Sequence, residues 1–111
     1  MTDRTELAAA LDTARRRLID AEGHPVIPGW NRQIEYYFSD VDEHWLMAVV
    51  DGMPAEPVQE ESDDPDIRIT MSSETFIGLM NGTINGLKAV TSGKVRVKAS
   101  MADMRQMQVF M

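Results

Sequence analysis

The sequence predicts an α+β fold in which helices gather on one face of a β-sheet. Helical patterns occupy both ends of the chain and a stretch near residue 80, whereas alternating β-strand patterns occupy the middle and residues 94–100. The predicted strands follow one another in runs, which is typical of an α+β fold. A strict alternation of strands and helices would indicate an α/β fold instead. With 111 residues and no repeat, we expect residues 1–111 to form a single domain with one hydrophobic core.

The first element is an amphipathic helix followed by a connector, together residues 1–29. Asp3, with Glu6 three residues later, is typical of a helix start. Apolar residues then recur at helical spacing: Leu7, Ala10, Leu11, Ala14 and Leu18. We expect the helix to end near Glu22-Gly23, where the proline-punctuated connector 23–29 begins.

Strand patterns dominate the chain from residue 32 to residue 71. Residues 32–39 and 44–50 are rich in β-formers, and the polar residues between them predict a hairpin connection. After a turn at Asp51-Gly52, residues 55–60 predict a weak, proline-flanked edge strand, and the acidic run 60–64 predicts a solvated loop. Alternation returns at residues 67–71, which predicts a further strand.

Two short helices, a strand and a last helix complete the chain. Ser72 can cap a helix that Gly82 ends, and Asn85 can start another that Gly93 closes. Residues 94–100 predict a strand whose inward side chains are Val95, Val97 and Ala99. The last helix has a broad apolar side made of Met101, Met104, Met107, Phe110 and Met111.

Composition and charge exclude several classes of function. The net charge of −7 disfavours nucleic acid as a partner, and it repels anionic lipid headgroups at long range. There is no cysteine, so thiolate catalysis and sulfur-ligated metals are excluded, and a reducing cytoplasm fits. The N-terminus does not resemble a signal peptide, because charged residues interrupt its apolar runs. We therefore expect a cytoplasmic protein.

Catalytic and metal-binding motifs are weak. Six residues separate Gly86 from the Gly93-Lys94 pair, and Val95 follows, so the spacing and chemistry of a phosphate-binding loop are missing. His44 lies near Asp40, Asp42 and Glu43, but a hydrophilic hairpin explains this cluster better than a metal site does. His24 has no nucleophile or acid at an interpretable spacing. The sequence therefore predicts no enzyme, no cofactor and no metal.

Methionine is the unusual residue, with nine in the chain, several of them in the last eleven positions. Methionine is flexible and polarisable, so it can line a cavity that accepts ligands of more than one shape. A methionine stripe at helical spacing also simply fills a core, and composition alone favours that interpretation.

Three segments resemble the sterol carrier protein type-two, or nonspecific lipid-transfer, family. They are residues 66–72 (DIRITMS), 82–89 (GTINGLKA) and 92–98 (SGKVRVK), with Phe76 between the first two. The resemblance extends over residues 32–110. It implies a five-stranded, mostly antiparallel sheet with helices over one face and an apolar tunnel between them.

The resemblance also implies which side chains bind the ligand. The tunnel would be lined by Phe76, Leu79, Met80, Ile84, Leu87 and Val90, with an adaptable lid of Met101, Met104, Met107 and Phe110. Inward strand residues would contribute as well: Tyr36, Phe38, Trp45 and Met47.

The leading hypothesis is a protein that binds and carries fatty acyl, isoprenoid or sterol-like lipids without covalent chemistry. An alternative is an accessory subunit that presents a lipid or quinone intermediate to a biosynthetic enzyme. A third is a packed interaction or dimerisation module. Transient contact with a membrane or a biosynthetic enzyme is compatible with the first two hypotheses, and the oligomeric state stays open.

Overall fold

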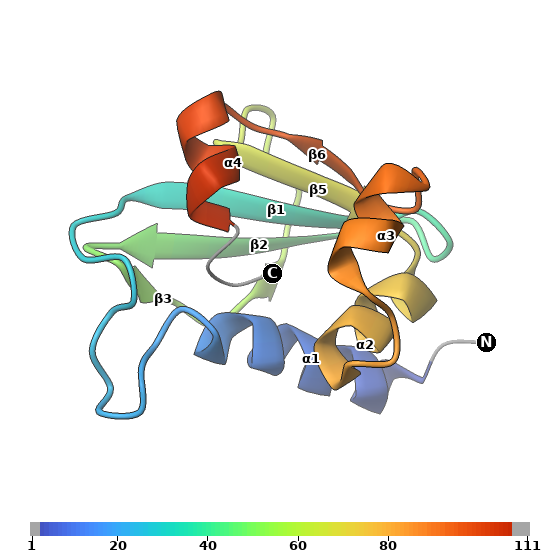
Figure 1. Ribbon diagram of the computed structural model, residues 1–111, viewed down its shortest axis with the longest axis horizontal. Coiled ribbons are helices and arrows are strands. Elements are labelled where there is room, and N and C mark those ends of the chain that lie inside the picture. Colours follow the sequence, from blue (N-terminus) through green and yellow to red (C-terminus); the bar gives the residue numbers. More distant parts are fainter. Residues whose placement is uncertain (1–2, 108–111) are drawn as a thin grey trace.

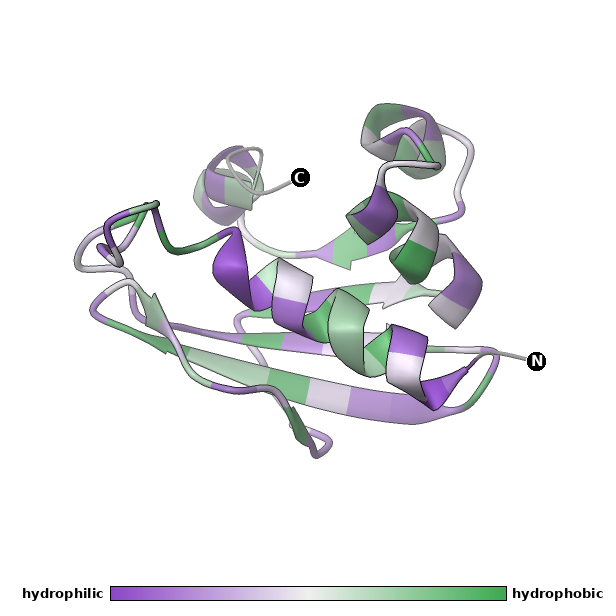
Figure 2. Ribbon diagram, turned by 90° about the horizontal axis from the view of Figure 1, so that it is seen from below, coloured by the Kyte–Doolittle hydropathy of each residue, from purple (hydrophilic) through white to green (hydrophobic). Residues whose placement is uncertain are grey.

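A mixed β-sheet forms one layer, and four helices lie on one side of it (Figures 1 and 2). The computed structural model of the protein describes residues 3–107. The helices are α1 (Arg4–Arg16), α2 (Ser73–Asn81), α3 (Gly86–Thr91) and α4 (Met101–Met107). The strands are β1 (Arg32–Phe38), β2 (Glu43–Val50), β3 (Met53–Pro54), β4 (Val58–Gln59), β5 (Ile67–Met71) and β6 (Arg96–Lys98).

The strand order is β3-β2-β1-β5-β6, and β4 also pairs with β2. Since β1 occupies one edge of β2, the two short strands β3 and β4 share the other edge. The six strands thus fill five positions across the sheet. All pairings are antiparallel except that of β1 with β5, which is parallel. The expected α+β architecture with a mostly antiparallel sheet is confirmed.

The core lies between the helices and the sheet face that they cover. The strand register places Ile34 of β1 opposite Met47 of β2 and Ile67 of β5, and all three side chains are fully buried. Rings of Tyr36 and Phe38 pack against Phe76 of α2, with centroid distances of 5.2 and 5.1 Å. These contacts hold α2 against the centre of the sheet. The Phe76 ring is therefore enclosed by other aromatic side chains.

Capping residues fix the two central helices where the sequence predicts them. The Ser72 side chain accepts a hydrogen bond from the N–H of Thr75 at 3.1 Å, and that of Asn85 accepts one from Lys88 at 3.1 Å. Gly82 ends α2 with φ of 83°, a left-handed conformation that favours glycine. The boundaries of both helices therefore follow from local hydrogen bonding.

The end of α1 differs from the prediction. The helix ends at Arg16 and not near Glu22-Gly23, because Leu18 and the residue after it bond to carbonyls only three residues back. The Asp20 carboxylate then accepts the N–H groups of Glu22 and His24 in a tight turn. Leu18 is still fully buried, so its place in the apolar pattern predicted its burial although it lies beyond the end of the helix.

Three strand boundaries also differ. The edge strand expected over 55–60 is reduced to the two residues of β4, and the short strand β3 was not predicted. Pro54 in β3 and Pro57 before β4 lack the N–H that a strand ladder needs, which keeps both strands short. The strand expected over 94–100 is only β6, because the N–H groups of Lys94 and Val95 bond to the Ala89 carbonyl of α3. The predicted alternation holds, since Val95 is buried and its charged neighbours are exposed.

Candidate functional site

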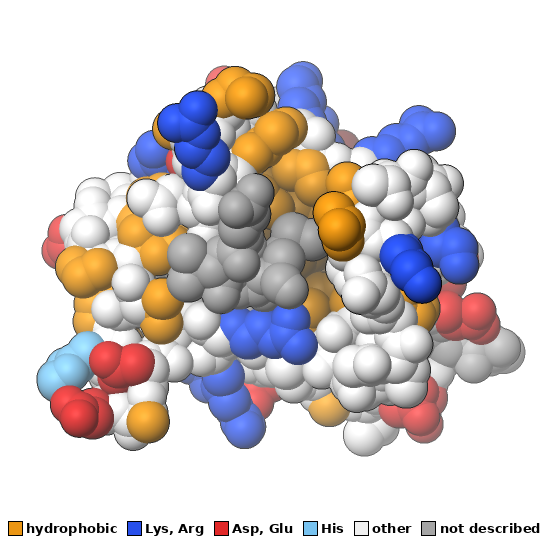
Figure 3. Space-filling model, viewed as in Figure 1, with side chains coloured by type: hydrophobic (Ala, Val, Ile, Leu, Met, Phe, Trp, Pro, Cys, Tyr) orange, Lys and Arg blue, Asp and Glu red, His pale blue; other side chains and the backbone are white. Residues whose placement is uncertain are grey.

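An apolar groove of about 590 Å³ lies between α3, β6 and α4. Its lining residues in the described part of the chain are Asn85, Gly86, Leu87, Val90, Val97, Met104 and Met107. Figure 3 shows hydrophobic side chains gathered between α4 and α3. Two hollows beside α1 are smaller, at about 190 and 310 Å³. The groove is therefore the main candidate for a ligand site.

Each wall of the groove is anchored to the fold. Helix α3 is held by Ala89, which is 1% exposed, so that Leu87 and Val90 are left at the surface. Strand β6 contributes Val97, which pairs with Ile69 of β5. The backbone positions of these side chains are thus set by packing and by the sheet ladder.

An ion pair holds α4 over the sheet. Both oxygens of Asp103 lie 3.0 Å from Nε of Arg32, which starts β1. Asp103 is 5% exposed, and its N–H donates to the Ser100 hydroxyl that precedes the helix. This fixes the rotation of α4, so that Met107 is buried while Met104 borders the groove and stays partly exposed.

The structure brings together four of the ten predicted ligand-binding residues. Those four line the groove: Leu87, Val90, Met104 and Met107. Three further lining residues were not among the predicted ten: Asn85, Gly86 and Val97. Val97 could have been identified from the sequence, because the alternation of its strand already predicted an inward side chain.

Five of the other six predicted residues lie elsewhere. Phe76 and Leu79 are buried in the core, and Met80 and Ile84 are partly buried against it. Met101 is 71% exposed at the start of α4, and Phe110 lies outside the described residues. Of the strand residues, Tyr36, Phe38 and Met47 are buried in the core and Trp45 is packed against it.

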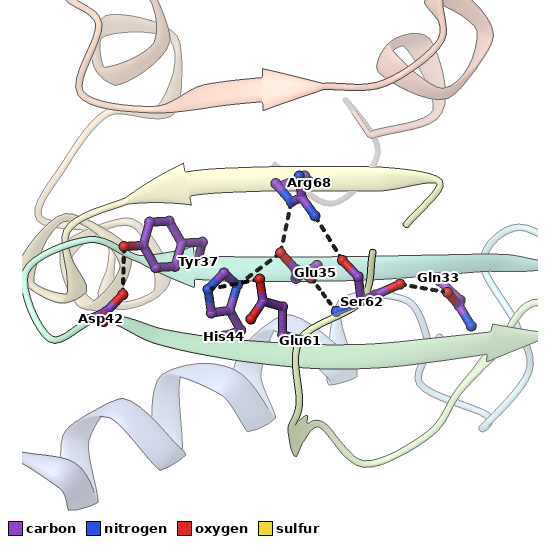
Figure 4. A network of polar contacts seen from close by, with 8 residues as sticks. All are labelled: Gln33, Glu35, Tyr37, Asp42, His44, Glu61, Ser62 and Arg68. Atoms are coloured by element: carbon purple, nitrogen blue, oxygen red, sulfur yellow. Dashed lines mark hydrogen bonds and ion pairs between the residues drawn. The ribbon is translucent and has the colours of Figure 1, made fainter. Parts of the chain in front are cut away.

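A polar network covers the opposite face of the sheet (Figure 4). The fully buried carboxylate of Glu35 accepts hydrogen bonds from Nε of Arg68 at 2.8 Å and from the N–H of Ser62 at 2.7 Å. Nδ1 of His44 lies 3.1 Å away, and its ring stacks on Tyr37. Burial would raise the pKa of Glu35, but these hydrogen bonds hold it below the usual range.

This network ties the loop of residues 60–64 to the sheet. Arg68 also donates to the carbonyl of Ser62 at 2.8 Å, so both the N–H and the carbonyl of Ser62 are hydrogen-bonded to the sheet. His44, one of the two histidines considered above, is thus placed in a structural cluster on the far side of the sheet from the groove. Within residues 3–107, no group of three His, Asp or Glu side chains is arranged to hold a metal ion.

None of the helices among the described residues has the length and hydrophobicity needed to cross a bilayer. Eight large apolar side chains are exposed in the described part of the chain, and four of them lie on α3 and α4: Leu87, Val90, Met101 and Met104.

Solved structures with a similar fold include a complete relative and a part of a larger enzyme. Sterol carrier protein 2 like 2 from Aedes aegypti has a TM-score of 0.66 and 16% sequence identity, covering 96% of this chain and 95% of that chain. The inverting sec-alkylsulfatase Pisa1 from Pseudomonas sp. has a TM-score of 0.60 and 15% identity, covering 90% of this chain and 14% of that chain. These likenesses establish the fold.

Sequence comparison identifies the family. The peroxisomal multifunctional enzyme A of Dictyostelium discoideum is 32% identical over 57 residues, which are 51% of this chain and 13% of that enzyme. This chain therefore spans only a small part of that relative. The sequence model of the SCP-2 sterol transfer family matches residues 11–111, nearly the whole sequence. The chain belongs to the SCP-2 sterol transfer family.

Proposed function

We propose that this protein binds fatty acyl, isoprenoid or sterol-like lipids in the groove between α3, β6 and α4 and carries them without covalent chemistry. The observation that carries the proposal is the apolar wall of the groove. Among its described lining residues only Asn85 has a polar side chain, and that side chain caps α3. A wall of this kind attracts hydrocarbon without directional contacts, so it favours binding of several lipid classes.

The size of the groove suits one small lipid. Its volume of about 590 Å³ falls within the roughly 300–1,000 Å³ of ordinary ligand pockets. Met104 and Met107 border it from α4, and methionine side chains adapt to ligands of different width. Ligand length and volume, more than headgroup chemistry, should therefore decide which lipid binds.

The energetics support reversible binding. Burial of about 0.8 kcal/mol per methylene gives a sixteen-carbon tail on the order of 12 kcal/mol before losses. Lost ligand freedom and side-chain ordering remove several kcal/mol. The remainder of about 8 kcal/mol corresponds to a dissociation constant near 1 μM, which suits a carrier that must also release its ligand.

A relative supports an acyl ligand. The Aedes aegypti protein SCP2L2, whose fold has a TM-score of 0.62 to this chain over 97% of it, was solved in a palmitated form. The absence of titratable side chains among the described lining residues favours carriage over catalysis at the groove. The histidine nearest to a carboxylate network, His44, lies on the other side of the sheet.

The direct test is displacement of a fluorescent fatty acid by unlabelled lipids. We expect saturable micromolar binding, and the variant Val97→Trp should weaken it at least about tenfold because the added ring fills the groove. Val50→Trp is the matched control, because Val50 is 62% exposed on the opposite sheet face. No saturable binding across several lipid classes, or equal effects of the two variants, would refute the proposal.

A second candidate is presentation of a bound lipid to an enzyme. It is favoured by the occurrence of this fold within larger enzymes, of which this chain spans 13% and 14%. The test compares turnover of an apolar substrate delivered on this protein with turnover from detergent. Faster turnover in a defined complex with the enzyme supports presentation, and equal turnover leaves free carriage.

A further inference from the structure

Charge is distributed unevenly along the chain. Residues 82–107 contain five Lys or Arg residues and one acidic residue, a net charge of +4, whereas the whole chain carries −7. The remaining residues therefore carry −11. The five cations are Lys88, Lys94, Arg96, Lys98 and Arg105. All five are on or beside α3, β6 and α4, the elements that form the groove.

These cations are available to a partner. All five are exposed, and none forms an ion pair with another residue in the range 3–107. The single acidic residue of the segment, Asp103, is buried and paired with Arg32, so it hardly offsets them at the surface. Figure 3 shows Lys and Arg side chains over α3 and α4 on either side of the hydrophobic ones.

Large apolar side chains are exposed between the cations. Leu87 on α3 is 75% exposed and Met101 on α4 is 71% exposed, while Val90 and Met104 at the groove are 42% and 38% exposed. Arg96 and Lys98 pair with Thr70 and Arg68, so their side chains lie on the opposite face of the sheet. We therefore call α3, β6 and α4, with these apolar side chains and the cations Lys88, Lys94 and Arg105, the basic face. It combines an electrostatic attraction with side chains that can enter a hydrocarbon layer.

We propose that the basic face docks on the surface of an anionic lipid bilayer, with the mouth of the groove turned toward the headgroups. Apolar insertion and basic residues are the two contributions that bind peripheral proteins to such membranes. An acidic protein surface would match the cations but would leave Leu87 and Met101 without an apolar environment. The inference rests on the proposed lipid binding. If the groove binds lipid, docking in this orientation would let a lipid pass directly between the bilayer and the groove.

The negative net charge of the chain does not oppose docking at close range. Electrostatic screening reduces interactions beyond about 8–10 Å at physiological salt. The molecule measures 37 × 28 × 27 Å, so acidic groups on its far side lie beyond this distance from a membrane at the basic face. The expectation from net charge, that anionic headgroups repel the protein at long range, therefore does not describe contact in this orientation.

The first test measures binding to vesicles of phosphatidylcholine, with and without about a third of phosphatidylserine. We expect binding only with phosphatidylserine and its loss at about 0.5 M salt. The variant Lys88→Gln/Arg105→Gln should lower partitioning about 25-fold, since each basic residue near such a surface contributes about fivefold. The control Arg4→Gln/Arg16→Gln removes the same charge from exposed side chains of α1 and should change partitioning less than about twofold.

The second test locates the contact. Because the chain has no cysteine, single variants Leu87→Cys and Val50→Cys can each carry one environment-sensitive dye. Val50 is 62% exposed but belongs to the opposite face of the sheet. A blue shift with anionic vesicles at position 87 alone supports the proposal, and equal shifts overturn it.

Other outcomes separate the two proposals. Binding that is independent of phosphatidylserine, or equal losses in both double variants, overturns docking through the basic face. A dimer in the absence of vesicles that Leu87→Ser dissociates would assign this face to a second copy and would also overturn it. Fluorescent fatty-acid binding in vesicle-free solution is measured in parallel, because its failure refutes lipid binding and its persistence leaves only the docking face in question.

Discussion

Replacing Arg68 by Met should destabilise the protein and reverse part of its pH dependence. Arg68 is the charged partner of Glu35, a carboxylate that is fully buried on the sheet face away from the groove. Met keeps most of the aliphatic stem and removes the guanidinium. The carboxylate is then left with the N–H of Ser62 and the ring of His44 as hydrogen-bond partners.

The magnitude follows from what is lost. Breaking a buried ion pair by removing one partner costs about 3–5 kcal/mol. Arg68 is 31% exposed and Glu35 keeps two partners, so we expect a loss smaller than this, about 2–3 kcal/mol. For a domain of this size that is a fall in Tm of about 10 °C.

The pH dependence has a defined sign. In the wild type the pKa of Glu35 lies below its ordinary 4.5, so this group stabilises the fold above that pH and the contribution is lost on acidification. In Arg68→Met burial dominates and the pKa rises above 4.5. Glu35 then destabilises the fold as pH increases toward that raised pKa and above it, and the loss of stability relative to wild type should be smallest at the acidic end, below pH 4.5.

The assay is urea unfolding followed by circular dichroism at several pH values. Arg96→Met is the matched control, because Arg96 lies on the same sheet face opposite Thr70 and has no ion pair among the described residues. It should change stability by less than about 0.5 kcal/mol. Equal stabilities of the two variants, or a loss in Arg68→Met that does not depend on pH, would refute the reasoning.

Three other substitutions test the packing of the fold and the position of α4. Gly52→Ala should cost at least about 2 kcal/mol, because φ is +81° and the new Cβ would overlap the Ile27 carbonyl oxygen; thermal unfolding measures it. Phe76→Ala should cost about 3–5 kcal/mol in urea unfolding, since its ring is 1% exposed between Tyr36 and Phe38. Asp103→Asn should speed hydrogen exchange of the α4 amides at least about tenfold, as about 1.5 kcal/mol of the bond to Arg32 is lost; unchanged exchange would mean that this pair does not hold the helix.

Local signals explain why much of the fold could be predicted. Ser72, Gly82 and Asn85 act through neighbours within four residues, so the ends of α2 and the start of α3 follow from sequence alone. Alternation in β1 and β5 identified the buried face. The resemblance to a known family supplied the number of strand positions and the one-sided helix layer, which no local pattern contains.

Long-range pairing explains what could not be predicted. The parallel pairing of β1 with β5 joins residues more than thirty positions apart, and nothing in either strand specifies its direction. Glu35 has the alternation of a solvent-facing residue, yet Arg68 and the loop at Ser62 bury it. Likewise Phe76 had the character of a ligand contact, but two aromatic rings of β1 enclose it in the core.

The central claim is that a hydrocarbon chain lies in the groove between α3, β6 and α4, and photolabelling tests it most directly. A palmitate analogue with a photoreactive group at the end of its tail is bound, irradiated and mapped by peptide mass spectrometry. The account predicts saturable adducts in residues 85–107, which excess palmitate suppresses and Val97→Trp reduces. Adducts confined to α1, or labelling that palmitate does not suppress, would contradict it.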